Sequence, residues 1–432
     1  MICKSYKLKK RILSSTLFKD SFWALSGSAV GQGLSLVASI FIARMLGKDI
    51  FGMYGIVRST LFSVAAFSTF GLSYTATKFV AEYSKSQPSK LATIIRNSIQ
   101  ITLFTSSILA VLLFIFSHQV AQYLETPKLY NSIRLLAVIV IFNSIRTTQV
   151  SILAGFRKFK EMAIINLING IFTFASSIVL TYFYGLDGAL IALFISQIVN
   201  CIQNYIELRK TIKAKDINIK DKTSIRKELL SFSLPMAVQE VIQPIFTWVI
   251  PILIIKFSNF GEVGLYNAAQ QWYAVILFIP GTLRNVILSH ISSNKDNDSQ
   301  QVSILNKMLL INFFATFIPF LVLFFFSSLI EKAYGNTFTS LQGVLNISVL
   351  SAIFVCLNNM IRQYFMAVGK VWVSFWVYLG SSLMFAGTFV GLSVFFDDEK
   401  SALHMAQSFL GTQITFFIIF YMLFRWYSKG KK

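Results

Sequence analysis

Long apolar runs recur along the whole chain, and they constrain the fold more than any other feature of the sequence. Each run holds more than 18 residues, and about 20 apolar residues are enough for a helix to cross a bilayer. The strands of a membrane β-barrel are only about ten residues long and alternate in polarity, so these runs predict an all-α integral membrane protein. We identify twelve predicted transmembrane helices, at about 21–43, 50–73, 95–117, 133–154, 162–183, 187–207, 230–255, 264–288, 304–328, 342–366, 371–395 and 402–425.

The distribution of charge predicts the orientation of these helices. Charged residues make up 13% of the chain, about half of the roughly 25% found in soluble domains. With the N-terminus inside, thirty of the 39 Lys and Arg residues fall on the inner side and seven on the outer side. This asymmetry predicts that both termini are cytoplasmic, and it accounts for the net charge of +21 without a nucleic-acid partner. The basic residues 1–20 precede a run that we interpret as an uncleaved first helix.

An internal repeat divides the chain into two predicted six-helix lobes. The sequence Gly-x-Tyr begins the second and eighth runs, at Gly52 and Gly264, and Asn-x-x-Arg occurs in the fourth and tenth, ending at Arg146 and Arg362. Six helices return the chain to its starting side, so the two halves share one orientation, as in many alternating-access transporters. We predict an N-lobe at 1–208, a basic cytoplasmic linker at 209–228 and a C-lobe at 229–432.

Charged residues inside the runs mark candidate functional positions. A charge at the centre of a transmembrane helix costs about 2.5–3.5 kcal/mol on insertion scales, so it faces a bundle interior or a wet cavity. Arg58 and Glu240 both lie near the middle of their runs. They either neutralise each other as an ion pair or line a cavity. In the second case Arg58 binds an anionic substrate group, and Glu240 couples transport to a proton or to a cation such as Na⁺.

The two Asn-x-x-Arg motifs place Arg146 and Arg362 at similar depth in the two lobes. Two guanidinium groups near an inward opening suit a diphosphate headgroup. Alternatively, both side chains extend to anionic lipid headgroups.

Amide side chains suggest a surface for sugars. Gln32 lies within a polar stripe of the first run, and the eighth run carries three amides, Asn267, Gln270 and Gln271. These groups suit sugar hydroxyls, and equally they can bond one helix to another. Neither a nucleotide-binding loop nor a hydrolase or metalloprotease signature is present, so we predict a transporter without a cofactor or metal site and not an enzyme.

Two segments resemble the polysaccharide-flippase (Wzx-like) branch of the multidrug/oligosaccharidyl-lipid/polysaccharide exporter superfamily. They are SFWALSGSAVGQGLSLVASIFIARMLGKDIFGMYG at 21–55 and ILAGFRKFKEMAIINLINGIF at 152–172. The resemblance implies a V-shaped, two-lobed exporter fold whose first, second, seventh and eighth helices face a central cavity. It also implies that a polyprenyl-diphosphate-linked oligosaccharide moves from the cytoplasmic to the periplasmic leaflet of a bacterial inner membrane. The implied partners are this lipid-linked oligosaccharide, membrane lipids and polysaccharide-assembly proteins.

Two alternatives stay open. An ion-coupled multidrug efflux antiporter of the same superfamily would use Glu240 as its coupling carboxylate. An integral-membrane glycan polymerase or ligase is the other, and the absence of a large outer loop argues against it.

Overall fold

The structure is a computed structural model that describes residues 16–69, 71–86, 88–123, 129–214, 244–246, 248–293, 298–367, 370–395 and 400–429. Within these ranges every regular element is a helix, which confirms the predicted all-α class. Their bounds are α2 Thr16–Thr69, α3 Leu72–Ser86, α4 Pro88–Ile115, α5 Ser117–Tyr123, α6 Tyr130–Gly155, α7 Phe159–Ala214, α9 Phe260–Ser293, α10 Asp298–Tyr334, α11 Leu341–Ala367, α12 Val371–Phe395 and α13 Ser401–Lys429.

Two of these helices are hairpins of two membrane-spanning arms. A straight helix of 56 residues, the length of α7, would be about 84 Å long, more than twice the bilayer core. The helix α7 instead bends at Gly185 (φ 57°), and α2 bends at Gly47 (φ 73°). Both glycines adopt the left-handed conformation that L side chains rarely take.

The described residues therefore account for eleven of the twelve predicted spans and for the last part of the seventh. Eight helices are long and apolar enough to cross a membrane, and α2 and α7 each supply two spans. The helix α9 and the shorter apolar helix Pro244–Phe257 correspond to the eighth and seventh predicted runs.

The chain forms two compact units. The first contains Met1–Met45 and Tyr54–Ile252, and the second contains Leu46–Met53 and Leu253–Lys432. The turn between the two arms of α2 thus belongs to the second unit, although both arms belong to the first.

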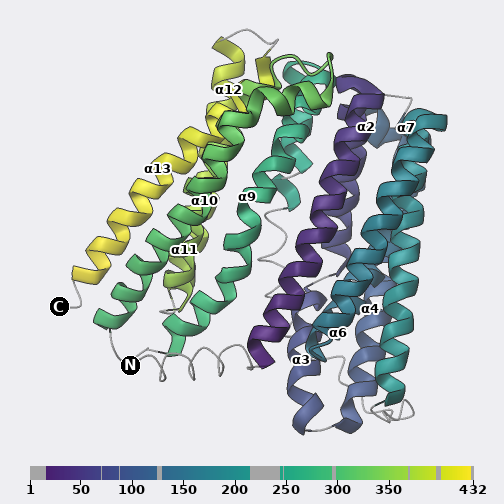
Figure 1. Cartoon of the computed structure of the whole chain (residues 1–432), viewed down its shortest axis with the longest axis vertical. Coiled ribbons are helices and arrows are strands. Elements are labelled where there is room, and N and C mark those ends of the chain that lie inside the picture. Colours follow the sequence, from purple (N-terminus) through teal and green to yellow (C-terminus); the bar gives the residue numbers. More distant parts are fainter. Residues whose placement is uncertain are drawn as a thin grey trace. The chain divides into compact units, whose positions relative to one another are not determined.

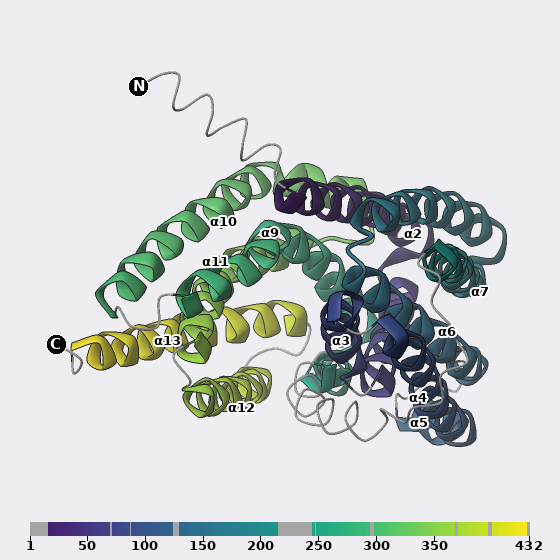
Figure 2. The same ribbon diagram turned by 90° about the horizontal axis from the view of Figure 1, so that it is seen from below.

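In the first unit, α6 packs against α3, α4 and α7 (Figures 1 and 2). At one end of these helices lies a core of buried aliphatic and aromatic side chains, with Val80 of α3, Ile94 of α4 and Ile152 of α6 at its centre. This core fixes the position of α6, which carries polar side chains behind the site described below.

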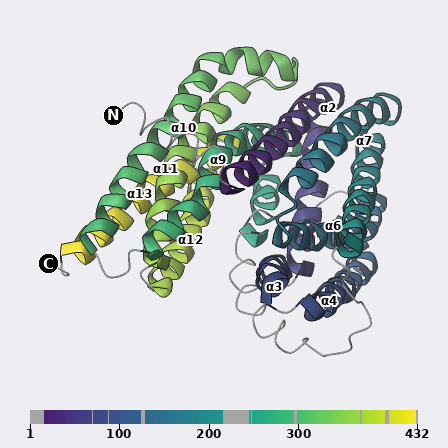
Figure 3. The same cartoon turned by 60° about the horizontal axis from the view of Figure 1, so that its bottom comes forward.

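In the second unit, α11 lies among α9, α10 and α13 (Figures 1 and 3). The aromatic rings of Tyr364 and Phe365 on α11 pack against Phe420 and Phe424 on α13. Interlocking rings of this kind give two apolar helices a defined register in which to pack.

Two sequence predictions concern residues that lie wholly or mostly outside the described ranges. Glu240 lies in 215–243, and so does most of the predicted linker 209–228. The lobe boundaries and the role of Glu240 stay predictions.

Candidate functional site

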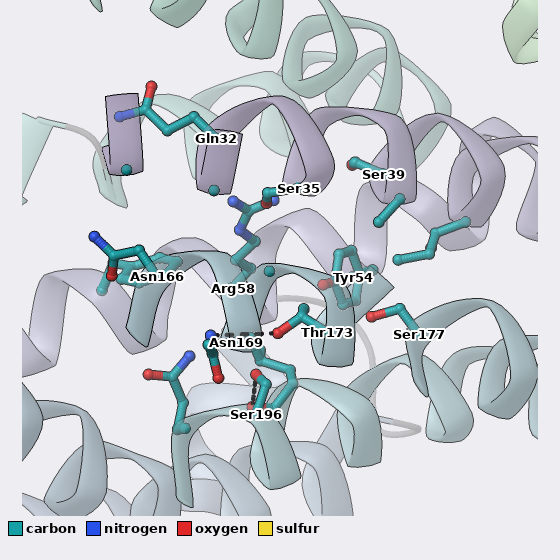
Figure 4. A pocket seen from close by; sticks show the side chains of 18 residues that line it. Gln32, Ser35, Ser39, Tyr54, Arg58, Asn166, Asn169, Thr173, Ser177 and Ser196 are labelled. Carbon is teal, nitrogen blue, oxygen red and sulfur yellow. Dashed lines mark hydrogen bonds between the residues drawn. The ribbon is translucent and has the colours of Figure 1, made fainter. Parts of the chain in front are cut away.

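A polar pocket lies within the first unit, between the two arms of α2 and the two arms of α7 (Figure 4). Its volume is about 280 Å³. The side chains that line it are mainly amides, hydroxyls and small residues. They are Gly27, Gly31, Gln32, Ser35, Ala38, Ser39 and Ile42 on the first arm of α2, Tyr54, Arg58 and Phe62 on its second arm, and Asn166, Asn169, Gly170, Thr173, Ser177, Leu193, Ser196 and Gln197 on α7.

Small residues allow the first arms of α2 and α7 to cross closely beside this pocket. A Cβ atom added to Gly27 would lie 2.4 Å from both the Cα and the Cβ of Ala163. The position therefore accepts no side chain larger than hydrogen without moving a helix. The close crossing holds the polar face of α2 against the polar face of α7.

Arg58 is the one charged residue among the described residues that line the pocket. Its guanidinium carbon lies 5.7 Å from the centre of the Phe62 ring, a distance at which a cation is attracted to an aromatic face. Figure 4 shows Arg58 extending into the pocket toward the arm of α2 that carries Ser35. The pocket thus combines one positive charge with a neutral polar lining.

Several polar atoms of the lining have no hydrogen-bond partner among the described residues. These atoms include Oγ of Ser39, a residue that is 3% exposed, and Oδ1 of Asn169. Asn169 uses its Nδ2 to donate to Oγ1 of Thr173 at 3.4 Å. A buried polar atom without a partner costs roughly 1–3 kcal/mol, so a polar ligand or water would stabilise this wall.

The structure places two of the predicted site residues, Arg58 and Gln32, in this pocket. Arg146 is not among its lining residues. It lies on α6 beside Cys201 of α7, and its buried Nε has no hydrogen-bond partner among the described residues. Asn143, three residues before Arg146 on the same helix, donates a hydrogen bond to the pocket residue Gln197. Arg146 therefore lies on the same helix as the residue that supports the pocket from outside it.

The remaining predicted residues that are described lie in the second unit. Arg362 is held beside Tyr378 of α12, with 5.2 Å between the guanidinium carbon and the ring centre. On α9, Nδ2 of Asn267 and Oε1 of Gln271 are buried without hydrogen-bond partners among the described residues, and Gln270 is half-buried. Their binding roles stay predictions.

Sequence reasoning missed the α7 side of the pocket. Asn166, Asn169, Thr173 and Ser177 follow one another at spacings of three or four residues, so they share one helical face. The same spacing singles out the polar stripe of the first run that contains Gln32, and applied to residues 162–183 it would have identified this wall.

Known proteins resemble the chain in both sequence and fold. The polysaccharide biosynthesis protein family matches residues 17–288, more than half of the chain. A Shigella flexneri protein named "Putative O-antigen transporter" is 23% identical over 366 residues, covering 82% of this chain and 86% of its own.

Two solved structures share the fold over most of their length. A multidrug resistance MATE family transporter of the MOP superfamily, in an inward-facing conformation, matches with a TM-score of 0.74 at 13% identity, covering 92% of this chain and 97% of its own. The lipid II flippase MurJ, in an inward closed conformation, matches with a TM-score of 0.72 at 18% identity, covering 91% and 86%. The predicted exporter fold is thereby confirmed, and the chain is a multi-pass membrane protein that belongs to the polysaccharide biosynthesis protein family.

Proposed function

We propose that this protein is a flippase for a polyprenyl-diphosphate-linked oligosaccharide repeat unit. It moves the headgroup by alternating access from the cytoplasmic to the periplasmic leaflet of a bacterial inner membrane, in the synthesis of a surface polysaccharide such as O-antigen or capsule. The observation that carries this proposal is the pocket itself, in which one guanidinium lies among neutral amides and hydroxyls.

The chemistry of the pocket fits a sugar diphosphate. The planar fork of a guanidinium binds phosphate oxygens through two parallel hydrogen bonds, which suits Arg58 to the diphosphate. A glycan cannot cross hydrocarbon because its hydroxyl groups would lose their hydrogen bonds to water. The amides of Asn166, Asn169 and Gln197 supply replacement partners, and the polyprenyl tail stays in lipid throughout.

The size of the pocket limits what it holds. Ligand pockets commonly measure roughly 300–1,000 Å³, and this one is about 280 Å³. It therefore accommodates the part of the headgroup nearest the diphosphate, while further sugars of the repeat unit lie outside it.

The same lining suits an anionic headgroup better than a cationic drug. A cationic drug needs an acidic group beside it, and no Asp or Glu occurs among the described residues that line this pocket. The likeness to MATE transporters extends to the fold alone.

Mass spectrometry of lipid extracts tests the proposal. A strain that lacks this gene and has no redundant flippase is complemented with the wild type, with Arg58→Gln, or with Arg44→Gln as a matched control, because Arg44 is exposed and lies outside the pocket. We expect the deletion strain and the Arg58→Gln strain to accumulate a polyprenyl-diphosphate-linked oligosaccharide and to lose surface glycan. Unchanged lipids and intact glycan in the deletion strain would refute the flippase.

A further inference from the structure

An arginine near one end of the first unit lies beside two aromatic rings. The guanidinium carbon of Arg134 on α6 is 4.5 Å from the centre of the Phe114 ring on α4, and it is also 4.5 Å from the centre of the Tyr130 ring on α6. A cation at this distance is attracted to the face of each ring. We refer to these three residues as the arginine stack. The two rings hold the guanidinium in one place.

The stack forms because its residues recur at helical spacing. Tyr130 and Arg134 are four residues apart on α6, so they share one face of that helix. The short helix α5 packs against α6. The ring of His118 on α5 lies edge-on to Tyr130, with 5.9 Å between the ring centres, and His118 is hydrogen-bonded to Gln122 at 3.1 Å. The Tyr130 ring beside Arg134 is therefore itself held in position.

Two features of this place favour an anion. The Nε atom of Arg134 is buried and has no hydrogen-bond partner among the described residues. Arg134 also lies only five residues after Leu129, the N-cap of α6, which makes no side-chain cap, and the first turn of α6 has no acidic residue. The N-terminus of a helix carries partial positive charge. A cation so close to it is unfavourable unless an anion lies nearby.

An exposed apolar face adjoins the stack. Ile108, Val111 and Ile115 on α4 are exposed and follow one another at spacings of three and four residues, and Phe114 is exposed beside them. In a membrane-spanning helix such a face is covered by lipid tails. The predicted orientation puts this end of α4 and α6 on the outer side. A lipid whose tail lies along α4 brings its headgroup to the level of Arg134.

We propose that the arginine stack binds the phosphate group of a lipid on the outer side of the membrane. The planar fork of a guanidinium donates two hydrogen bonds to phosphate oxygens, and Nε of Arg134 is one of its donors. A protein carboxylate would meet the charge but would leave the apolar face of α4 unused. No residue of the stack lines the polar pocket, so this site is separate from it and does not depend on the flippase function.

Native mass spectrometry of the purified, delipidated protein tests the site. It compares the binding of phosphatidylglycerol with that of a diacylglycerol that has the same tails and no phosphate. We expect Arg134→Gln to weaken phosphatidylglycerol binding by ~10-fold. The control Arg44→Gln removes an exposed arginine that also lies on the predicted outer side, and it should leave the affinity unchanged. Equal affinities in the two variants, or equal binding of the two lipids by the wild type, would overturn the proposal.

A second variant covers the case in which Arg134→Gln does not fold. Phe114→Leu keeps the charge and removes one ring, so the guanidinium is held less firmly. We expect phosphatidylglycerol binding to weaken by roughly 2–5-fold. Phe104→Leu is the control, because Phe104 is another exposed phenylalanine of α4. The same affinity in the two leucine variants would contradict a role for the stack.

Competition against phosphatidylglycerol identifies the source of the phosphate. Stronger competition by a polyprenyl diphosphate than by unlabelled phosphatidylglycerol assigns the site to a polyprenyl lipid, and weaker competition assigns it to membrane phospholipid. Either result supports a lipid phosphate site. Equal displacement by inorganic phosphate would contradict it, because the tail would then contribute nothing.

Glu125 lies in residues 124–128, outside the described ranges, between α5 and α6. We expect Glu125→Gln to leave phosphatidylglycerol binding unchanged. A higher affinity in this variant would mean that the carboxylate competes with the lipid for Arg134. The site would then be an internal ion pair and not a lipid site.

Discussion

Asn143 of α6 donates a hydrogen bond from Nδ2 to Oε1 of Gln197 on α7, with 3.0 Å between the two atoms. Asn143 is 3% exposed, and Gln197 lines the polar pocket. The bond therefore supports the pocket from the side of α6. It uses the amide oxygen of Gln197 and leaves the amide nitrogen to face a ligand. Thr147, one turn further along α6, donates to the carbonyl oxygen of Asn143 at 2.8 Å, which extends the polar support along the helix.

Replacing Asn143 by leucine tests this support. The change leaves the half-buried amide oxygen of Gln197 without its donor, and an acceptor left unsatisfied costs up to about 3 kcal/mol when it is fully buried. We expect Asn143→Leu to lower the thermal unfolding temperature in detergent and to reduce glycan export. The control is Asn131→Leu on the same helix, where the side chain is exposed. If the two variants unfold at the same temperature, the bond contributes nothing to the pocket.

Arg58→Lys separates the charge of the pocket from its geometry. Lysine keeps the positive charge but lacks the planar fork that binds two phosphate oxygens at once. A hydrogen bond to a charged group is worth roughly 1.5–3 kcal/mol, so the loss of one such bond lowers affinity by about tenfold or more. Binding of a polyprenyl diphosphate to the purified variant measures this loss. Wild-type affinity in Arg58→Lys would mean that Arg58 acts only as a distant charge.

The crossing of the first arms of α2 and α7 is sensitive to a single methyl group. In Gly27→Ala the new Cβ would meet Ala163 at 2.4 Å, and relief of this overlap must push the arms apart at a cost of roughly 1–3 kcal/mol. Gly33→Ala on the same arm is the control, because its added Cβ would meet nothing within 4 Å. We expect only Gly27→Ala to lower the unfolding temperature and export. A wild-type unfolding temperature and wild-type export in Gly27→Ala would show that the two arms do not need this close approach.

Glu262 predicts a pH dependence of stability. It precedes the apolar run that begins at residue 264, and burial raises the pKa of its carboxyl group above 4.5, against the opposing effects of the Ala402 amide and Lys48. Between the ordinary and the raised pKa, the folded protein binds more protons than the unfolded chain. The free energy of unfolding therefore falls as the pH rises through this window.

Glu262→Gln removes that titrating group, so we expect its unfolding temperature to exceed that of the wild type most at the upper end of the window. The difference should shrink as the pH is lowered toward 4.5, the ordinary carboxyl value. Thermal unfolding of both proteins across this pH range measures the difference. A gap that widens on acidification would mean that the carboxylate form stabilises the fold.

The helices were predictable because apolar length alone determines what can cross a bilayer. The way in which neighbouring helices are joined was not predictable. The outer turn at Gly47 and the bend at Gly185 leave α2 and α7 continuous, and a hydropathy pattern does not distinguish a sharp turn between helices from a loop. The confirmed fold thus follows from the composition of the runs, while the bends depend on single glycine conformations.

The site was predictable in part. Arg58 stands out because a charge in an apolar run is costly, and Gln32 because its polar neighbours share one face. Asn169 carried a similar signal in its spacing from Asn166 and Thr173, whereas Gln197 gave none, since an amide in a transmembrane helix bonds to another helix as readily as to a ligand. Only the tertiary packing of α7 against α2 shows that these amides face a pocket.

The role of Glu240 is decided by comparing single and double variants. If Glu240 couples transport to an ion, Glu240→Gln should fold at wild-type levels and export about tenfold less glycan, because a neutral amide cannot take up and release a proton or hold a cation. If Glu240 only neutralises Arg58, each single variant leaves an uncompensated charge. The double variant Arg58→Gln with Glu240→Gln should then be more stable than either single variant, since loss of one partner of a buried pair costs more than loss of both. Unfolding temperatures and export measured in the three variants distinguish the two roles, and near-normal export by Glu240→Gln would remove the coupling hypothesis.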